Sequence, residues 1–197
     1  MIIGSVSATD AEDNTISPDD SLNAIEETIV SSNPINDSLS AADVEITLSS
    51  SSVHVSPKGS DSEGDGSSQN PYQSLRHAIE KSAEGSTIHL ANGNYSGEDN
   101  RNISINKSLT IIGDSRDKVI IDGENLARIL IINSPIAAKL ESLTLINGYD
   151  PNGKTSLQGG AIYSYGASLT LDKVTVKDSN GNGNGGGVYN YIGRLTI

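Results

Sequence analysis

The sequence predicts an all-β solenoid, a coil of short parallel strands that follows a disordered N-terminal segment. Three observations lead to this fold class: a 26-residue repeat near the end of the chain, short apolar runs with a period of two, and an unusual composition. The 197 residues contain no Cys, Trp or Phe, and seven Tyr are the only aromatic residues. Ile, Leu, Val and Ala must therefore fill a narrow and regular core. The lack of Cys excludes disulfide frameworks, thiolate zinc sites and cysteine nucleophiles.

The charge is unevenly distributed along the chain. Residues 1–52 hold ten acidic residues and twelve Ser but no Lys, Arg or His, whereas residues 53–197 hold fifteen acids and thirteen bases. A segment with low hydrophobicity and one sign of charge cannot offset the entropy lost on folding, so we interpret 1–52 as an acidic, Ser-rich disordered segment. Basic clusters are absent, which argues against nucleic acid as a partner. No apolar run reaches the roughly 18 residues of a membrane span.

The first eight residues resemble the end of a secretory signal. An apolar start leads to the small-x-small pattern Val6-Ser7-Ala8, which is typical of a cleavage site. No basic residue precedes it and the apolar stretch is short, so we interpret residues 1–8 as the remnant of a signal that starts upstream. The alternative is a chance match. The first interpretation predicts an extracellular or cell-surface protein.

Order is expected from Val53, and a single helix follows a polar, Gly-rich loop. Pro71 suits a helix start, with Asn70 as its cap. A helical spacing then relates Leu75, Ala78, Ile79 and Ser82, and Gly85 ends this pattern. One apolar face on a short helix indicates that the helix lies against the rest of the fold.

After this helix the apolar period changes to two. Short β-rich runs, separated by Gly, Asn or Asp, occupy 87–90, 103–106, 109–113, 119–123, 129–133 and 140–146, with a turn expected at 92–95. No second helical segment interrupts these runs, which excludes an alternating βαβ architecture.

The repeat decides between β architectures. Residues 159–171 align without gaps on 185–197, with six identities in thirteen positions. A Leu-Thr-Ile or Leu-Thr-Leu element starts at positions 109, 143, 169 and 195, with spacings of 34, 26 and 26. Repeats of this length indicate a solenoid, in which like residues of successive turns stack about 4.8 Å apart. We therefore expect Ile162 to stack with Val188 and Leu169 with Leu195, with Thr170 facing outward.

These motifs resemble the right-handed parallel β-helix of the pectate-lyase-like superfamily. They are similar to the adhesin-like surface proteins of methanogenic archaea and to the polymorphic outer-membrane-protein repeats. The matching segments are 56–61, 70–75, 85–95, 105–113 and the Gly-Gly-Ala-Ile-Tyr repeat. The resemblance implies that 53–197 form a right-handed, single-stranded parallel β-helix whose N-terminal end is capped by the helix. Because the sequence stops in mid-strand at Ile197, we expect a coil truncated at its C-terminal end; an end covered by self-association is the alternative.

Catalytic candidates in such a fold are clustered carboxylates. The sequence offers Asp114, Asp117, Asp122 and Glu124, with Arg116, Lys118 and Arg128 nearby. Acids beside glycines usually form turns, so we favour a structural role over catalysis. No catalytic residue is assigned on this basis.

The metal candidates are also weak. The loop from Asp61 to Gly66 imitates the start of an EF-hand, but Tyr72 stands where the bidentate Glu belongs. We interpret it as a flexible polar loop. His54, His77 and His89 show no metal-binding spacing and are interpreted as unrelated surface residues. The sequence therefore predicts no metal and no cofactor.

The tyrosines form the one candidate ligand site. In the repeat register Tyr163 should stack with Tyr189, and Tyr165 with Tyr191. Aromatic ladders that face outward suit stacking against sugar rings, although they also seal solenoid faces. These four residues are the predicted glycan-binding site.

The resulting functional hypothesis is a non-enzymatic, adhesin-like protein of the cell surface, or the N-terminal fragment of one, that contacts glycans or other cells. A carbohydrate-active β-helix enzyme, a polysaccharide lyase or hydrolase, is the alternative. A structural wall component without a ligand is a third interpretation. The sequence leaves the ligand and the oligomeric state open.

Overall fold

The computed structural model describes residues 51–133, 135–150, 158–183 and 185–197. The predicted signal remnant at 1–8 lies outside the described residues, as does the predicted disordered segment apart from its last two residues.

Fourteen strands, one α-helix and one 3₁₀ helix make up the described residues. The first part of the chain holds β1 (Ser52–Val55), α1 (Leu75–Lys81), β2 (Thr87–Leu90), β3 (Gly93–Tyr95), η1 (Glu98–Asn100) and β4 (Ile103–Ile105). The middle holds β5 (Leu109–Gly113), β6 (Val119–Asp122), β7 (Leu130–Asn133), β8 (Ala137–Glu141) and β9 (Thr144–Ile146). The last part holds β10 (Ile162–Tyr165), β11 (Ser168–Asp172), β12 (Thr175–Lys177), β13 (Val188–Tyr191) and β14 (Arg194–Thr196).

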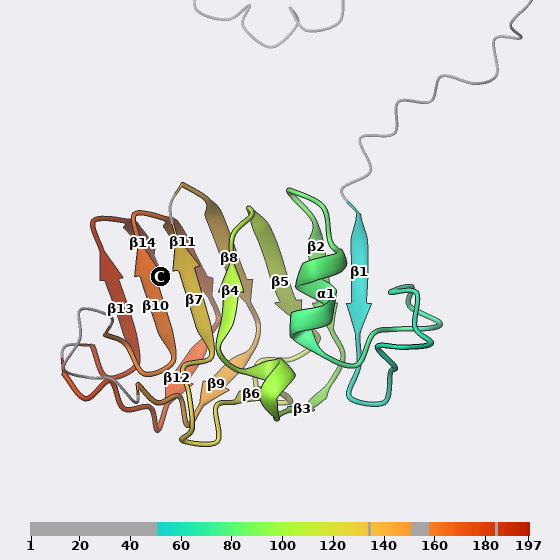
Figure 1. The fold of residues 1–197 in the computed structure, drawn as a ribbon, viewed down its shortest axis with the longest axis horizontal. Helices are drawn as coiled ribbons and strands as arrows, with labels where there is room; N and C mark the ends of the chain where they lie inside the picture. The colour runs from blue at the N-terminus through green and yellow to red at the C-terminus, as the bar shows by residue number, and fades with distance from the viewer. Residues whose placement is uncertain (1–50, 134, 151–157, 184) are drawn as a thin grey trace, which may run out of the picture. The chain divides into compact units, whose positions relative to one another are not determined.

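The strands form three parallel sheets, as Figure 1 shows. Sheet A has six strands in the order β1-β2-β5-β8-β11-β14, sheet B has four in the order β3-β6-β9-β12, and sheet C has four in the order β4-β7-β10-β13. Each complete turn thus gives one strand to each sheet, and every strand inside a sheet pairs in parallel with the strands of the turns before and after it. The predicted parallel β-helix is confirmed.

The interior consists of stacked aliphatic side chains. In sheet A one inward row contains Val53, Ile88, Ile111, Leu140 and Leu171, each in register with the next. All five are buried, Leu140 and its neighbour Ile111 completely. Alternate residues face outward because successive side chains of a strand point to opposite faces. This stacking explains how a core without Phe or Trp is filled.

The register of the repeat is also as predicted. Ile162 pairs with Val188 and Leu169 with Leu195, while Thr170 alternates outward between buried leucines. The prediction that the element starting at Leu143 is equivalent to those at Leu109 and Leu169, however, is wrong. Leu143 directly precedes β9 of sheet B, and the residue in register between Leu109 and Leu169 is Ala138.

The turns are less regular than the repeat suggests. Register partners in sheet A are 23, 29, 31 and 26 residues apart, from Thr87 through Thr110, Lys139 and Thr170 to Thr196. Residues 93–95, expected as a turn, form β3 because Tyr95 fills the interior, where its hydroxyl donates to the carbonyls of Val55 and Ala91 at 3.1 and 2.7 Å.

Helix α1 covers the N-terminal end of sheet C, next to β4 (Figure 1). It begins at Leu75 with Ser74 as its cap, four residues after the predicted start at Pro71, because Tyr72 is held in a β-bridge with Val55. The buried face contains Leu75, Ala78 and Ile79, as the spacing predicted. The part of the chain that the structure describes contains no helix long and apolar enough to cross a membrane.

Candidate functional site

The four predicted tyrosines lie together on the outer face of sheet C. Tyr163 and Tyr165 are two residues apart on β10, so both point to the same side, and Tyr189 and Tyr191 repeat this arrangement on β13. The parallel register places Tyr163 beside Tyr189 and Tyr165 beside Tyr191. We call these four residues the tyrosine patch.

The rings of the tyrosine patch are closely associated. Ring centroids are 6.0 Å apart for Tyr163 and Tyr189, 5.8 Å for Tyr165 and Tyr191, and 6.2 Å for Tyr189 and Tyr191. The planes of the first and last pairs are within 14° of parallel, and those of the second are tilted by 33°. The predicted stacking between adjacent turns is therefore confirmed, whereas ligand binding by these residues stays a prediction.

The patch has a covered and an open half. Tyr163 is only 6% exposed, whereas Tyr165 and Tyr191 are 40% and 49% exposed. Burial and the neighbouring phenols raise the pKa of the Tyr163 hydroxyl. Tyr165 and Tyr191 thus offer most of the ring surface that a ligand can reach.

A buried ion pair supports the covered half. The Arg128 guanidinium bonds to the Asp150 carboxylate at 2.7 Å and donates from Nε to the Gly159 carbonyl at 3.0 Å. Its central carbon lies 5.9 Å from the centroid of the Tyr163 ring. The sequence placed Arg128 among catalytic candidates and missed this role, because nothing in its local sequence indicates burial beside Asp150.

Gly159 is required where the chain enters this region. Its φ is +91°, and a Cβ there would lie 2.2 Å from the Ile162 carbonyl oxygen and 2.9 Å from Tyr189 Cβ. Only glycine adopts this conformation and leaves room for such a close approach. The repeated glycines of the Gly-Gly-Ala-Ile-Tyr motif thus have a steric cause next to the tyrosine patch.

Two of the catalytic candidates have structural partners. The Asp122 carboxylate accepts from the Glu124 backbone N–H at 2.8 Å and from the Asn147 side-chain amide at 2.9 Å. Glu124 pairs with Arg101 and accepts from the Gly97 backbone N–H at 3.0 Å. These acids fix corners between turns, as their positions beside glycines predicted.

Four of the other candidates lie at the surface. Asp117 pairs with its exposed neighbour Arg116 at 3.0 Å, and Lys118 is also exposed. Asp114 instead lines a cavity with two histidines. The seven candidates therefore make separate contacts, and the structure does not assemble them into one constellation around a shared substrate position.

The carboxylates of the acidic loop accept hydrogen bonds from backbone N–H groups of the residues that follow the loop. Asp61 accepts from the backbone N–H groups of Gln73 and Ser74 at 2.7 and 3.0 Å, which lowers its pKa against the opposing effect of burial. Asp65 accepts from the backbone N–H of Ser67 at 2.8 Å. Among the described residues, no three His, Asp or Glu side chains are grouped as metal ligands.

The interpretation of the histidines as unrelated is wrong for two of them. His54 and His89 are register partners on β1 and β2, and their rings stack with centroids 5.0 Å apart and planes 16° from parallel. They share a cavity of about 220 Å³ with Asp114. The pairing joins residues 35 positions apart, so only the strand register could have revealed it. His77 packs against Tyr72 instead.

Comparison with known proteins identifies a family and a distant relative. The family model described as "Protein of unknown function (DUF1565)" matches residues 57–189. The uncharacterized protein YwoF of Bacillus subtilis (strain 168) is 34% identical over 83 residues, which cover 38% of this chain. The chain spans only 16% of the length of that relative. No solved structure matches the chain at a significant level.

Proposed function

The chain belongs to the DUF1565 family, a family of parallel β-helix proteins, and on that premise we propose that it is a non-enzymatic, adhesin-like domain of the cell surface that binds glycans through the tyrosine patch. The β-helix is a rigid scaffold that holds side chains of successive turns at a fixed spacing. The ligands are glycans on surfaces or on other cells, and the location is extracellular.

One observation carries the proposal. Tyr165 and Tyr191 present about half-exposed rings, 5.8 Å apart, on a face held by buried rows beneath it. Phenol rings combine an apolar face with a polar edge, and therefore suit the C–H faces and hydroxyl groups of pyranoses. Strand pairing also fixes the backbone positions of both residues, so a ligand does not have to order the backbone when it binds.

A glycan array probed with the intact protein tests the proposal. We expect saturable binding to at least one class of glycan, and we expect the double variant Tyr165→Ala/Tyr191→Ala to lose about tenfold or more in affinity. Tyr149→Ala is the matched control, because Tyr149 lies outside the tyrosine patch, in a bridge to Asn180. Its affinity should match that of the unmodified chain once circular dichroism has shown that both variants are folded.

Two outcomes would contradict this function. Absence of binding to every glycan by the intact, folded protein would remove the adhesin-like role. Shortening of bound polysaccharides during the incubation would instead favour the carbohydrate-active enzyme, and the variants Asp122→Asn and Asp114→Asn would then locate its carboxylates.

A further inference from the structure

The tyrosine patch continues into a row of side-chain amides. Asn133 is in register with Tyr165, which pairs with Tyr191, so these three occupy one outward row on β7, β10 and β13. Asn106 directly follows Ile105, which is the last residue of β4 and the register partner of Ile132, so it continues this row just beyond the end of β4. All four side chains are exposed. We call the series Asn106, Asn133, Tyr165 and Tyr191 the amide–tyrosine row.

The two amides are free to bind a ligand. Within the described part of the chain, neither the Asn106 nor the Asn133 side chain makes a hydrogen bond. Each carries two donors and one acceptor, the complement that sugar hydroxyls and acetamido groups use. Asn106 also lines a cavity of about 330 Å³ between α1 and β4, together with Ser104 and Glu80. The row thus ends in a hollow with polar walls.

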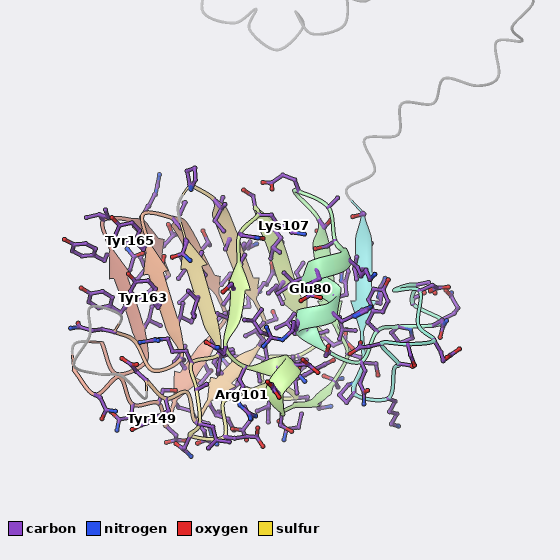
Figure 2. The ribbon with its side chains drawn as sticks, in the orientation of Figure 1. Glu80, Arg101, Lys107, Tyr149, Tyr163 and Tyr165 are labelled. Atoms are coloured by element: carbon purple, nitrogen blue, oxygen red, sulfur yellow. The ribbon has the colours of Figure 1, made fainter. Side chains whose placement is uncertain are left out.

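The row runs along the solenoid axis, across the strands. Neighbouring members are separated by one strand spacing of about 4.8 Å, so the four positions span about 14 Å. One strand spacing is close to the length of a pyranose residue in an extended, equatorially linked chain. Figure 2 shows Tyr163 and Tyr165 at one end of this face and Glu80 and Lys107 at the other, beside α1.

The charges around the row disfavour an anionic ligand. The row itself contains no charged residue, and Lys107 donates to the Ile79 and Ser82 carbonyls at 3.0 and 2.7 Å, at the C-terminus of α1. Arg76 is held by Asp99 and by two backbone carbonyls. A carboxylate or sulfate on the ligand would therefore find these cations already engaged, whereas Glu80 is exposed and would repel it.

Resting on the proposed function, we propose that the ligand is a neutral, linear glycan of about four residues or more, laid along the axis so that tyrosines contact two sugar rings and amides bind the next two. The tyrosines then supply stacking area and the asparagines supply hydrogen bonds to successive residues.

A length series of neutral oligosaccharides, titrated into the intact protein by calorimetry, tests this inference. The probes are linear, equatorially linked gluco- and N-acetylglucosamine oligomers of one to six residues. Affinity should rise with length and level off near four residues, with each amide contributing about two- to tenfold. The double variant Asn106→Ala/Asn133→Ala should lose the gain from the third and fourth residues and keep the affinity for the dimer.

Asn94→Ala is the matched control, since Asn94 is an exposed asparagine on β3 of sheet B. It should leave the whole series unchanged. Equal affinity for dimer and tetramer would overturn the inference and leave the proposed function standing. Tighter binding of a uronate oligomer of equal length would overturn the neutral ligand class. Binding of no saccharide at all would overturn the inference together with the proposed function.

Discussion

The outer faces of sheets A and C differ sharply although they share one interior. On sheet A the outward row through Thr110, Lys139 and Thr170 is small, hydroxylated and charged, with Lys139 paired to Glu141 at 2.7 Å. On sheet C the corresponding outward rows carry the tyrosine patch and the amides. Both faces rest on stacked, buried aliphatic residues. The inward residues thus determine the β-helix, whereas the outward residues can differ between sheets without disturbing the core and can form a ligand-binding surface.

The largest expected effect comes from breaking the buried ion pair beside the tyrosine patch. Arg128→Met leaves Asp150 buried without its guanidinium partner, and breaking a buried pair in this way typically costs about 3–5 kcal/mol. Arg128 and Asp150 are 6% and 0% exposed, so solvent cannot compensate. Urea denaturation measures the loss, and near-ultraviolet circular dichroism of the tyrosines should change with it.

The matched control is Arg101→Met. Arg101 pairs with Glu124 at the surface, where an ion pair contributes about 0–1 kcal/mol. Equal destabilisation by the two substitutions would mean that the Arg128 pair does not support the sheet C face in particular.

A smaller effect is expected from the interior that both faces share. Leu140→Ala removes one member of the buried row between Ile111 and Leu171, and comparable cavity-forming changes cost about 2–5 kcal/mol. Leu140 lies in the interior, so its substitution should lower the apparent ligand affinity only by reducing the fraction of folded protein.

The control is Thr170→Ala, in the outward row of β11, which should change the free energy of unfolding by less than about 0.5 kcal/mol. Urea midpoints that rank Thr170→Ala with Leu140→Ala would contradict the division between inner and outer rows.

The same division explains what could be predicted from the sequence. The gapless repeat predicts the inward rows of β10, β11, β13 and β14 and the stacking of the tyrosines, because its period directly gives the register between these turns. The Leu143 element was misassigned because the turn lengths vary, so that Ala138 takes the expected place of a leucine. The Arg128–Asp150 and His54–His89 pairs join different turns, and only the register of the coil determines such contacts.

The smallest expected effect is a pH dependence of stability that arises from sheet A and not from the tyrosine patch on sheet C. His54 on sheet A faces His89 and Asp114, and its Nε2 lies 3.3 Å from Ser52 Oγ. Burial and then His89 lower the His54 pKa, against a raising effect of Asp114. The unfolded chain therefore binds a proton more readily, and stability should fall as pH drops below about 6.5 toward the folded pKa.

Because His54 is only partly buried, solvent screening should keep this loss a fraction of the roughly 1.4 kcal/mol that one pKa unit represents. Thermal melts between pH 7.5 and 5 measure it, and His89→Gln should flatten the profile by removing the second imidazole. An unchanged slope in that variant would show that the stacked pair is not its source. The tyrosine patch contains no histidine, and Tyr163 has a raised pKa. Over the same pH range the glycan affinity of the folded protein should therefore stay constant while its stability falls.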